Sequence, residues 1–431
     1  MRHNLKKILA AAMAGNALEF YDFTIYAFFA VQIGAVFFPS DNPVNSTLSS
    51  LAVFAVGAIM RPVGGVLFGH IGDKYGRKRA LIICMAFMAF PTFLVGVLPG
   101  YNEIGIWAPI CLLICRLVQG LSVGGEYNGA SVFVVEHAAP HNKGFAGSMI
   151  STSSFMGWLM AALISYPFMM MFSSSVAWRL PFILGLVIGG IGFYLRRQIT
   201  ETSEFEEFIK KDKPEKLPVI TVLKEYPGAV LSTMGIAALS GLIGFTTLTY
   251  VSTYLTTFGG WQKPSALLVV MLGSVLYTIA CPLVGLLSDR IDPRKIILWS
   301  VGMIFLSAGP VFLLWNSGSI FGVILGQFLW AIVTVTYMAP MNLLMTRLFP
   351  VSLRYSGIGL GYSVGMAIFG GTTPLILTWL VDVTGSSFSP LIWIGFVGII
   401  GFFAVLLARP ICPVQAQGEF MDIKRRAVSG I

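Results

Sequence analysis

The chain has 431 residues, of which 56% are hydrophobic and only 11% are charged. A soluble globular protein carries about 25% charged residues, so this composition excludes an ordinary water-soluble enzyme. The net charge of +9 is compatible with a nucleic-acid binder, but such a protein clusters its basic residues on a water-exposed face. Here they lie between apolar runs. We therefore expect an all-α, polytopic membrane protein with the lipid bilayer as its surroundings and no nucleic-acid partner.

The first half of the chain contains six apolar runs, each long enough to cross a bilayer, which takes about 20 helical residues. They are predicted near residues 11–37, 49–71, 80–99, 105–136, 144–171 and 178–197. The start of the chain resembles a signal peptide, but Glu19, Tyr21 and Asp22 interrupt its apolar run. The first run is therefore expected to be a retained helix.

A polar segment of mixed charge follows, from Arg196 to Tyr226, and it is typical of a linker with an amphipathic helix lying on the membrane surface. Six more apolar runs are predicted near residues 227–258, 264–287, 296–315, 319–346, 354–382 and 389–409. The expected domains are an N-terminal six-helix bundle (1–197), a cytoplasmic linker (198–226), a C-terminal six-helix bundle (227–409) and a cytoplasmic tail (410–431).

The basic residues are distributed very unevenly among the connections. All but four fall on one side of the predicted membrane, the exceptions being Arg179 and Lys263 on the other side and Arg61 and Arg116 within spans. Connections rich in lysine and arginine stay in the cytoplasm. Both termini are therefore expected in the cytoplasm, with the protein in a bacterial cytoplasmic (inner) membrane.

An internal repeat relates the two halves. The segment Gly69-His-Ile-Gly-Asp73-Lys74-Tyr-Gly-Arg77-Lys78-Arg79 aligns with Gly285-Leu-Leu-Ser-Asp289-Arg290-Ile-Asp-Pro-Arg294-Lys295 at an offset of 216 residues. We therefore expect two pseudo-symmetric six-helix bundles. A charge network in these loops that forms when one face closes and breaks when it opens would bias a two-state motion. The candidate gating residues are Gly69, Asp73, Arg77, Lys78, Asp289, Arg290 and Arg294.

Ionisable residues inside spans are costly and usually face a cavity or a partner. Glu19, Asp22 and Tyr26 share one face of the first helix, and Gln119 and Glu126 share one face of the fourth. Three acids (Glu19, Asp22, Glu126) against two bases (Arg61, Arg116) leave one negative charge, which a proton can neutralise. Static salt bridges are the alternative interpretation. The candidate residues for proton coupling or substrate binding are Glu19, Asp22, Tyr26, Arg61, Arg116, Gln119 and Glu126.

The second half offers hydroxyl and aromatic side chains instead of charges. Such rings can hold a quaternary ammonium group by cation–π attraction, although aromatic residues also gather at membrane interfaces and threonines bond their own helix. The candidate second-half cavity residues are Tyr250, Tyr254, Trp330, Tyr337, Asn342 and Tyr362.

The paired loops resemble the loop signature of the major facilitator superfamily, and Arg116-Leu-Val-Gln119-Gly120 resembles its fourth-helix signature, in which a buried arginine is linked to proton coupling. Gly15-Asn16-Ala-Leu-Glu19-Phe-Tyr21-Asp22, Arg61-Pro62-Val-Gly64-Gly65 and Gly124-Gly125-Glu126-Tyr127 are similar to the metabolite:proton symporter family. That family includes transporters for proline and betaine, citrate, α-ketoglutarate and shikimate. In the second loop copy, Asp292 and Pro293 replace a glycine and an arginine, which weakens the likeness there.

The resemblance implies a secondary active transporter that takes up a small polar metabolite with protons by alternating access. A proton-coupled efflux antiporter of the same superfamily is an alternative, although residues 144–157 lack the proline expected in its fifth helix. A membrane-embedded enzyme is disfavoured, because the four histidines are scattered and no nucleotide motif stands out. No cofactor or metal is expected, and the functional unit is expected to be a monomer.

Overall fold

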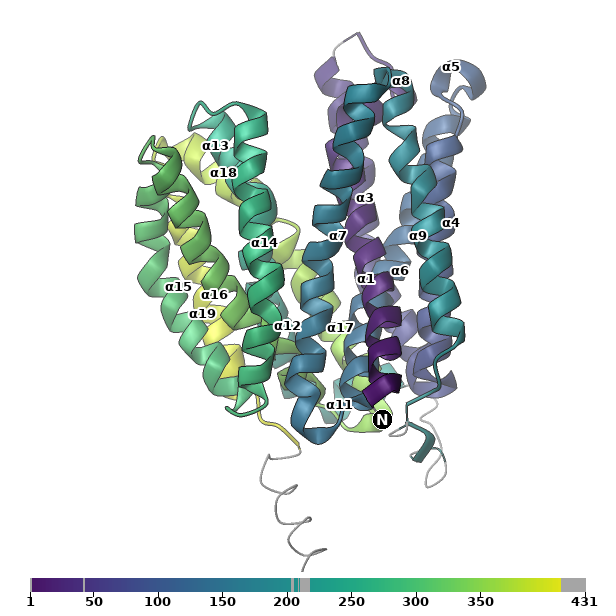
Figure 1. Ribbon diagram of the computed structural model, residues 1–431, viewed down its shortest axis with the longest axis vertical. Coiled ribbons are helices and arrows are strands. Elements are labelled where there is room, and N and C mark those ends of the chain that lie inside the picture. Colours follow the sequence, from purple (N-terminus) through teal and green to yellow (C-terminus); the bar gives the residue numbers. More distant parts are fainter. Residues whose placement is uncertain (1, 42, 203–204, 208, 210–217, 412–431) are drawn as a thin grey trace, which may run out of the picture.

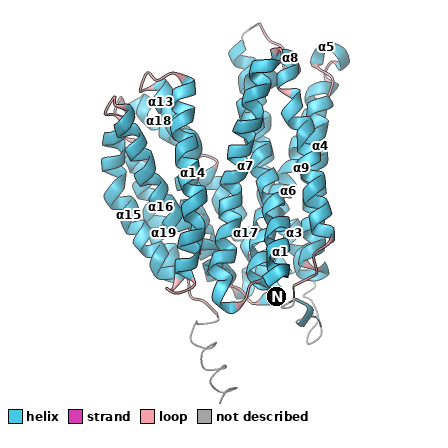
Figure 2. Cartoon of the chain, in the orientation of Figure 1, coloured by secondary structure: helices cyan, strands magenta, loops and turns pink. Residues whose placement is uncertain are grey.

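In the computed structural model, the described residues are 2–41, 43–202, 205–207, 209 and 218–411, and they form helices and short connections with no strand (Figures 1 and 2). Eleven helices are long and apolar enough to cross a membrane, or twelve if the bent pair α1 and α2 is one span. The predicted all-α membrane fold is confirmed. The tail beyond Ile411 and most of the charged part of the linker lie outside the described residues.

The first bundle consists of helices α1 (Arg2–Phe28), α2 (Ala30–Phe37), α3 (Pro43–Tyr75), α4 (Arg77–Val97), α5 (Tyr101–Ile104), α6 (Trp107–His137), α7 (Lys143–Met171), α8 (Ser174–Ala177) and α9 (Arg179–Arg197). The predicted first span is bent by 68° between α1 and α2. This bend lets α2 pack against α3. Pro62, Pro91 and Pro167 lie inside helices, where neighbouring helices can satisfy the carbonyl groups that a proline leaves free.

The second bundle consists of α12 (Pro227–Phe245), α13 (Val251–Thr257), α14 (Lys263–Ser288), α15 (Pro293–Trp315), α16 (Ile320–Thr346), α17 (Arg354–Gly365), α18 (Thr373–Thr384) and α19 (Pro390–Leu407), preceded by the short α11 (Pro218–Glu225). Two of its spans contain a π-helical turn, η2 (Thr246–Tyr250) and η4 (Met366–Gly370). Such turns widen a helix and re-aim the side chains that follow, and they occur often at functional sites.

The two bundles meet near one end of the molecule, which we call the closed end; it contains the connections at Gly76, 138–142, 289–292 and 347–353. Helix α3 packs against α17, and α7 against α14 and α16. A Cβ atom at Gly65 would lie only 2.4 Å from the carbonyl oxygen of Gly359, so glycine is needed for this approach. Toward the opposite end the ribbons of the two bundles diverge (Figure 1).

Candidate functional site

A small cavity lies where the two bundles meet, about midway along the helices. Its walls come from α1, α3 and α6 of the first bundle and from α17 and η4 of the second; the lining residues are Glu19, Phe20, Arg61, Val123, Tyr127, Tyr362, Ser363 and Met366. The cavity has room for about one water molecule. We call it the inter-bundle cavity, and it contains two of the predicted charged residues, Glu19 and Arg61.

Glu19 and Arg61 form a loose ion pair in this cavity. Arg61 Nη2 lies 3.9 Å from Glu19 Oε1, and the two side chains are 10% and 2% exposed. Neither Glu19 Oε2 nor Arg61 Nε has a hydrogen-bond partner among the described residues. The guanidinium also lies over the ring of Phe23, 4.6 Å from its centroid. A buried charge is costly unless it is well paired, so both groups retain the capacity to bind something else.

Asp22, in contrast, has three donors. It accepts hydrogen bonds from Arg116 Nη1 at 2.8 Å, from Gln119 Nε2 at 2.8 Å and from Thr92 Oγ1 at 2.9 Å. Arg116 lies 3.8 Å from the ring centroid of Tyr26. Asp22, Tyr26, Arg116 and Gln119 thus lie together, but they form a sealed cluster inside the first bundle and do not line the inter-bundle cavity.

Glu126 has a partner that the sequence analysis placed elsewhere. Arg196, assigned to the basic linker, is fully buried in α9, and its Nη1 donates to Glu126 Oε2 at 2.8 Å. It also donates to the carbonyl oxygens of Ala11 and Leu81, so it joins α1, α4, α6 and α9. The predicted surplus of one negative charge is therefore wrong: three acids in the first bundle face three arginines. Glu126 lies in this pair and not beside Gln119.

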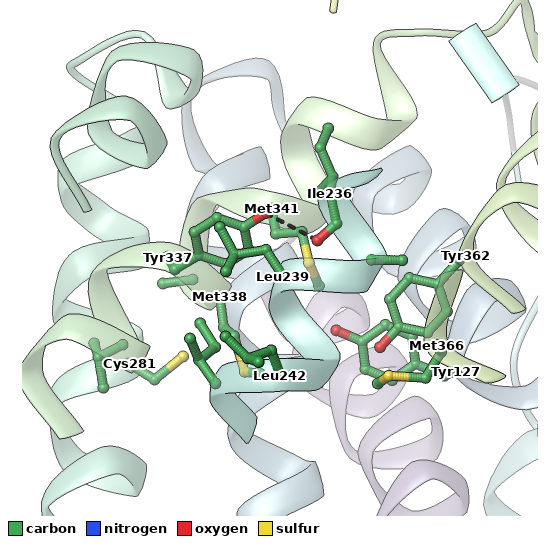
Figure 3. Packing of buried hydrophobic residues seen from close by; sticks show 14 of the residues in the cluster. Tyr127, Ile236, Leu239, Leu242, Cys281, Tyr337, Met338, Met341, Tyr362 and Met366 are labelled. Atoms are coloured by element: carbon green, nitrogen blue, oxygen red, sulfur yellow. Dashed lines mark hydrogen bonds between the residues drawn. The ribbon is translucent and has the colours of Figure 1, made fainter. Parts of the chain in front are cut away.

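Four of the six candidate residues of the second half pack inside that bundle and do not line the inter-bundle cavity. Tyr250, Tyr254 and Trp330 belong to an aromatic cluster inside the second bundle with Phe312 and Trp315. Tyr337 donates to the carbonyl oxygen of Ile236 at 2.8 Å, which satisfies its hydroxyl within the bundle. Figure 3 shows Tyr337 and Tyr362 on either side of the α12 residues Ile236 and Leu242. These rings form hydrophobic core, because packing against other rings stabilises them more than facing a polar cavity.

Tyr362 and Asn342 do lie at the junction of the bundles. The ring of Tyr362 stacks on Tyr127 of the first bundle with their centroids 4.8 Å apart, as Figure 3 shows. Asn342 Nδ2 donates to the carbonyl oxygen of Gly147 at 2.9 Å and to Ser151 Oγ at 3.2 Å. Of the six, only Tyr362 lines the inter-bundle cavity, while Asn342 joins α16 to α7.

The first loop copy joins the two bundles at the closed end. Asp73 accepts hydrogen bonds from the backbone N–H groups of Tyr355 at 3.2 Å and Ser356 at 2.7 Å, in the first turn of α17. It therefore caps a helix of the other bundle, where a carboxylate is favoured by the helix dipole. Arg77 pairs with Asp73 and donates to the carbonyl oxygen of Val351 at 2.6 Å. Gly69 lies directly against Ser356.

Glu136 and the start of the linker complete this network. Glu136 pairs with Arg354 of the second bundle at 2.9 Å and lies 3.6 Å from Arg77 Nε. The backbone N–H of Lys78 donates to Glu201 at 3.1 Å, and the side chain of Lys78 donates to the carbonyl oxygen of Arg197 at 3.2 Å. Lys78 therefore attaches the linker to the first bundle rather than bridging the two bundles.

The second loop copy mirrors only the aspartate. Asp289 accepts from the backbone N–H groups of Gly144 at 2.6 Å and Phe145 at 2.9 Å, in the first turn of α7. Burial raises the pKa of Asp289, and the two N–H groups partly offset this effect. Arg290 is exposed, and Arg294 donates to the carbonyl oxygen of Val405 at the end of α19 at 2.9 Å. Neither joins the two bundles: Pro293, which has no charged side chain, stands where Arg77 stands in the first copy, and Asp292 caps its own helix α15.

Two helical bundles with a charged cavity between them, joined by hydrogen-bonded loops at one end, define a polytopic membrane transporter. Residues 9–371 match the Major Facilitator Superfamily. The chain is 33% identical over 415 residues to the "Proline/betaine transporter" of Escherichia coli (strain K12), covering 92% of this chain and 82% of that protein. It is 34% identical over 419 residues to the "Glycine betaine/proline/ectoine/pipecolic acid transporter OusA" of Dickeya dadantii (strain 3937), covering 94% and 83%. The chain belongs to the Major Facilitator Superfamily, whose members transport and do not catalyse.

Solved structures agree with this fold. The proton:xylose symporter XylE bound to 6-bromo-6-deoxy-D-glucose superposes with a TM-score of 0.76 at 16% sequence identity, covering 94% of this chain and 95% of that one. A double tryptophan mutant of XylE gives a TM-score of 0.78 at 15% identity, covering 94% and 96%. The chain is accordingly an integral, multi-pass membrane protein with the architecture of these transporters.

Several residues of the site were missed from the sequence. Phe23 and Thr92 are an ordinary aromatic residue and an ordinary threonine in apolar runs, and only their contacts with Arg61 and Asp22 distinguish them. Glu136 sits at a predicted helix end, where an exposed charge is expected. The sequence does contain one indication that Arg196 is buried. If the helix extends to Arg197, one of the two adjacent arginines points toward the buried face of that helix.

Proposed function

We propose that the protein is a proton-coupled symporter that takes up a small zwitterion, of the proline and betaine type, by alternating access. The observation that carries this proposal is the pair of opposite charges in the inter-bundle cavity: Glu19 and Arg61, buried and incompletely bonded, beside the rings of Tyr127 and Tyr362. A zwitterion presents one carboxylate to an arginine and one cationic centre to an acid or an aromatic face.

The net charge of the cavity favours this class over the citrate and α-ketoglutarate alternatives. One acid and one base line the cavity, so it is neutral overall. A di- or tricarboxylate brings two or three negative charges, which would need further cations in a site of low dielectric. Arg116 and Arg196 are already engaged by Asp22 and Glu126. The names of the two relatives, which mention proline and betaine, point to the same class.

We also propose an orientation in the membrane. The closed end contains the basic connections at Lys74–Arg79 and Arg290–Lys295, and such connections remain in the cytoplasm. The closed end is then cytoplasmic, and both termini lie on the cytoplasmic side of a bacterial cytoplasmic membrane. The proposed domains remain residues 1–197, 198–226, 227–409 and 410–431, and the proposed functional unit is a monomer because the cavity and both loops come from one chain.

Uptake into proteoliposomes tests the function. The purified protein is reconstituted and supplied with radiolabelled proline, betaine, citrate, α-ketoglutarate and shikimate, with an inward proton gradient that is then collapsed. We expect accumulation of a zwitterion that disappears when the gradient collapses. Accumulation of citrate or α-ketoglutarate would overturn the substrate class, and substrate efflux driven by the same inward gradient would overturn the direction in favour of an antiporter.

A further inference from the structure

Helix α1 carries the same unit twice, an acid followed four residues later by an aromatic residue. Glu19 and Phe23 enclose the guanidinium of Arg61, and Asp22 and Tyr26 enclose that of Arg116. Because residues four apart lie on one helix face, each acid contacts its arginine from one side while the ring covers another. The two units differ in how completely the acid is bonded, and this difference suggests separate roles.

In the unit at Arg116 the acid is fully bonded within the first bundle, although Arg116 Nε and Nη2 have no hydrogen-bond partner among the described residues. Asp22 has three hydrogen-bond donors at 2.8 to 2.9 Å, and neither Asp22 nor Arg116 lines the inter-bundle cavity. A buried ion pair with this geometry resists dissociation, since breaking it would leave two uncompensated charges. In the unit at Arg61 the acid is not fully bonded: the pair is 3.9 Å apart, Glu19 Oε2 has no hydrogen-bond partner among the described residues, and both side chains face the cavity.

We propose that Arg61 is the binding site for the substrate's carboxylate and that Glu19 occupies this site until a proton neutralises it. The inference rests on the proposed function and deepens it by assigning the two halves of the coupling to two residues. Protonated Glu19 releases Arg61, whose guanidinium then accepts a carboxylate in the fork geometry that suits it. Phe23 keeps the guanidinium in place during the exchange through its contact with the charged plane.

The charges around Glu19 fit this exchange. The groups that face it are Arg61 from α3, Glu126 from α6 and Asp22 on its own helix, with Tyr127 and Tyr362 lining the same cavity. Glu126 is neutralised by Arg196 and Asp22 by Arg116. Arg61 is therefore the cation left for either Glu19 or a substrate carboxylate, and both cannot use it fully at once. A substrate carboxylate that takes the place of Glu19 at Arg61 leaves the Glu19 carboxyl buried without a cation, so one proton is taken up per substrate, and the cationic centre of a zwitterion then faces the rings of Tyr127 and Tyr362.

Equilibrium binding to the purified, full-length protein tests the carboxylate site. The probes are the carboxylates of the uptake panel, together with choline, which has the cation of betaine but no carboxylate. We expect wild-type affinity for the active carboxylate to rise as the pH falls and choline to bind about 10- to 100-fold more weakly. Arg61→Gln should lose a similar factor, and Arg61→Lys should recover part of it. Size-exclusion chromatography verifies that each variant is folded.

Glu19→Gln should behave as a permanently neutral Glu19. At every pH, its affinity for the carboxylate should equal the affinity that the wild type reaches at low pH. Substrate exchange should continue, while proton-driven accumulation is lost. In weakly buffered solution the wild type should take up about one proton per substrate bound, and Glu19→Gln none. The double variant Glu19→Gln/Arg61→Gln, which removes both charges, covers the case in which Arg61→Gln alone fails to fold; it should bind the carboxylate as weakly as choline.

The outcomes separate this inference from the proposed function. If the double variant binds the carboxylate as tightly as the wild type, the role of Arg61 is overturned, while the proposal of symport is unaffected. If Glu19→Gln still takes up a proton and Asp22→Asn does not, the coupling site lies in the sealed cluster and the role of Glu19 is overturned. If no carboxylate of the panel binds the folded wild-type protein, the substrate class and this inference both fail.

Discussion

At the scale of single residues, the first bundle balances its buried charges in pairs. Asp22 with Arg116 and Glu126 with Arg196 are close and well bonded, whereas Glu19 with Arg61 is not. Buried ion pairs contribute little net stability compared with apolar residues, but removing one member leaves an uncompensated charge and is strongly destabilising. The well-bonded pairs therefore maintain the geometry of the bundle around the single pair that is free to exchange.

The pair Glu126 and Arg196 gives a stability prediction. Arg196→Met should lower the free energy of unfolding by about 3–5 kcal/mol, because Glu126 then stays buried without its partner. Adding Glu126→Gln should restore a large part of this loss, since no unpaired charge remains. Unfolding by titration with denaturing detergent measures both variants. Equal losses in the single and the double variant would show that the charge on Glu126 is not what matters.

At the scale of helices, each bundle caps a helix of the other. Asp73 caps α17, and Asp289 caps α7, in both cases through two N–H groups of the first turn. The two caps are unequal. Asp73 is also bound by Arg77, whereas Asp289 has no arginine at the matching position, because Pro293 stands there. Closure at this end therefore depends more on the first loop than on the second.

Replacing each aspartate by asparagine tests this inequality. Asp73→Asn should favour opening of the closed end about tenfold, because the buried Arg77 loses its nearest carboxylate and keeps only Glu136, whose Oε2 lies 3.6 Å from Arg77 Nε. Asp289→Asn should have a smaller effect, since asparagine also caps a helix. The substitution also removes a carboxylate whose burial is costly, as the raised pKa of Asp289 indicates. The readout is labelling of a buried cysteine introduced at Ser356, in a background without the native cysteines.

The same prediction carries a pH dependence for the second loop. Closure raises the pKa of Asp289 through burial, so the protonated form is favoured in the closed state. Closure at this loop should be stronger below the ordinary pKa of an aspartate, about 3.9, and weaken as the pH rises through the raised value. Relative to the labelling rate of a small free thiol at the same pH, which removes the pH dependence of the thiol itself, the Ser356 cysteine should be labelled more slowly near pH 4 than near pH 7, and this difference should disappear in Asp289→Asn. An unchanged pH dependence in that variant would contradict the assignment.

At the scale of the whole molecule, the two bundles meet closely near one end and diverge toward the other (Figure 1). The contact relies on backbone approach at Gly65 and Gly359, where a side chain has no room. Packed interfaces of this kind have discrete arrangements and do not deform continuously. A rigid-body motion of one bundle against the other around the inter-bundle cavity is the simplest way to expose that cavity to each side in turn.

A bulky residue at position 65 should act as a wedge. Gly65→Val is expected to hold the closed end open, to raise labelling of the Ser356 cysteine and to reduce uptake at least tenfold, while the protein remains folded. Gly302→Val is the matched control, because a Cβ atom at Gly302 meets nothing within 4 Å; it should transport normally. Uptake of Gly65→Val at the wild-type rate would argue that the bundles do not need this contact.

The proposed orientation makes a prediction for the whole chain. Reporter enzymes fused after Arg409, and maleimide labelling of a cysteine at Lys78, should both report the cytoplasmic side. A cysteine at Glu103, in α5 at the opposite end, should be labelled from outside in intact cells. Labelling of the Lys78 position from outside would contradict the proposed orientation, because the closed end would then face the outside.

The sequence by itself determined the class of fold, because the number and length of apolar runs dictate the spans and a repeat at half the chain length dictates two related halves. It also picked out Glu19, Asp22, Arg61 and Arg116, since charges inside apolar runs are rare and visible. The partner of each buried charged or polar side chain became clear only from the packing of the helices. Arg196 reaches Glu126 across 70 residues, Asp73 reaches α17 across more than 280, and Tyr250, Tyr254 and Tyr337 pack inside their own bundle, whereas Tyr362 stacks on the first. The physical reason is that periodicity defines a face of one helix, whereas the partner of that face depends on how all the helices pack.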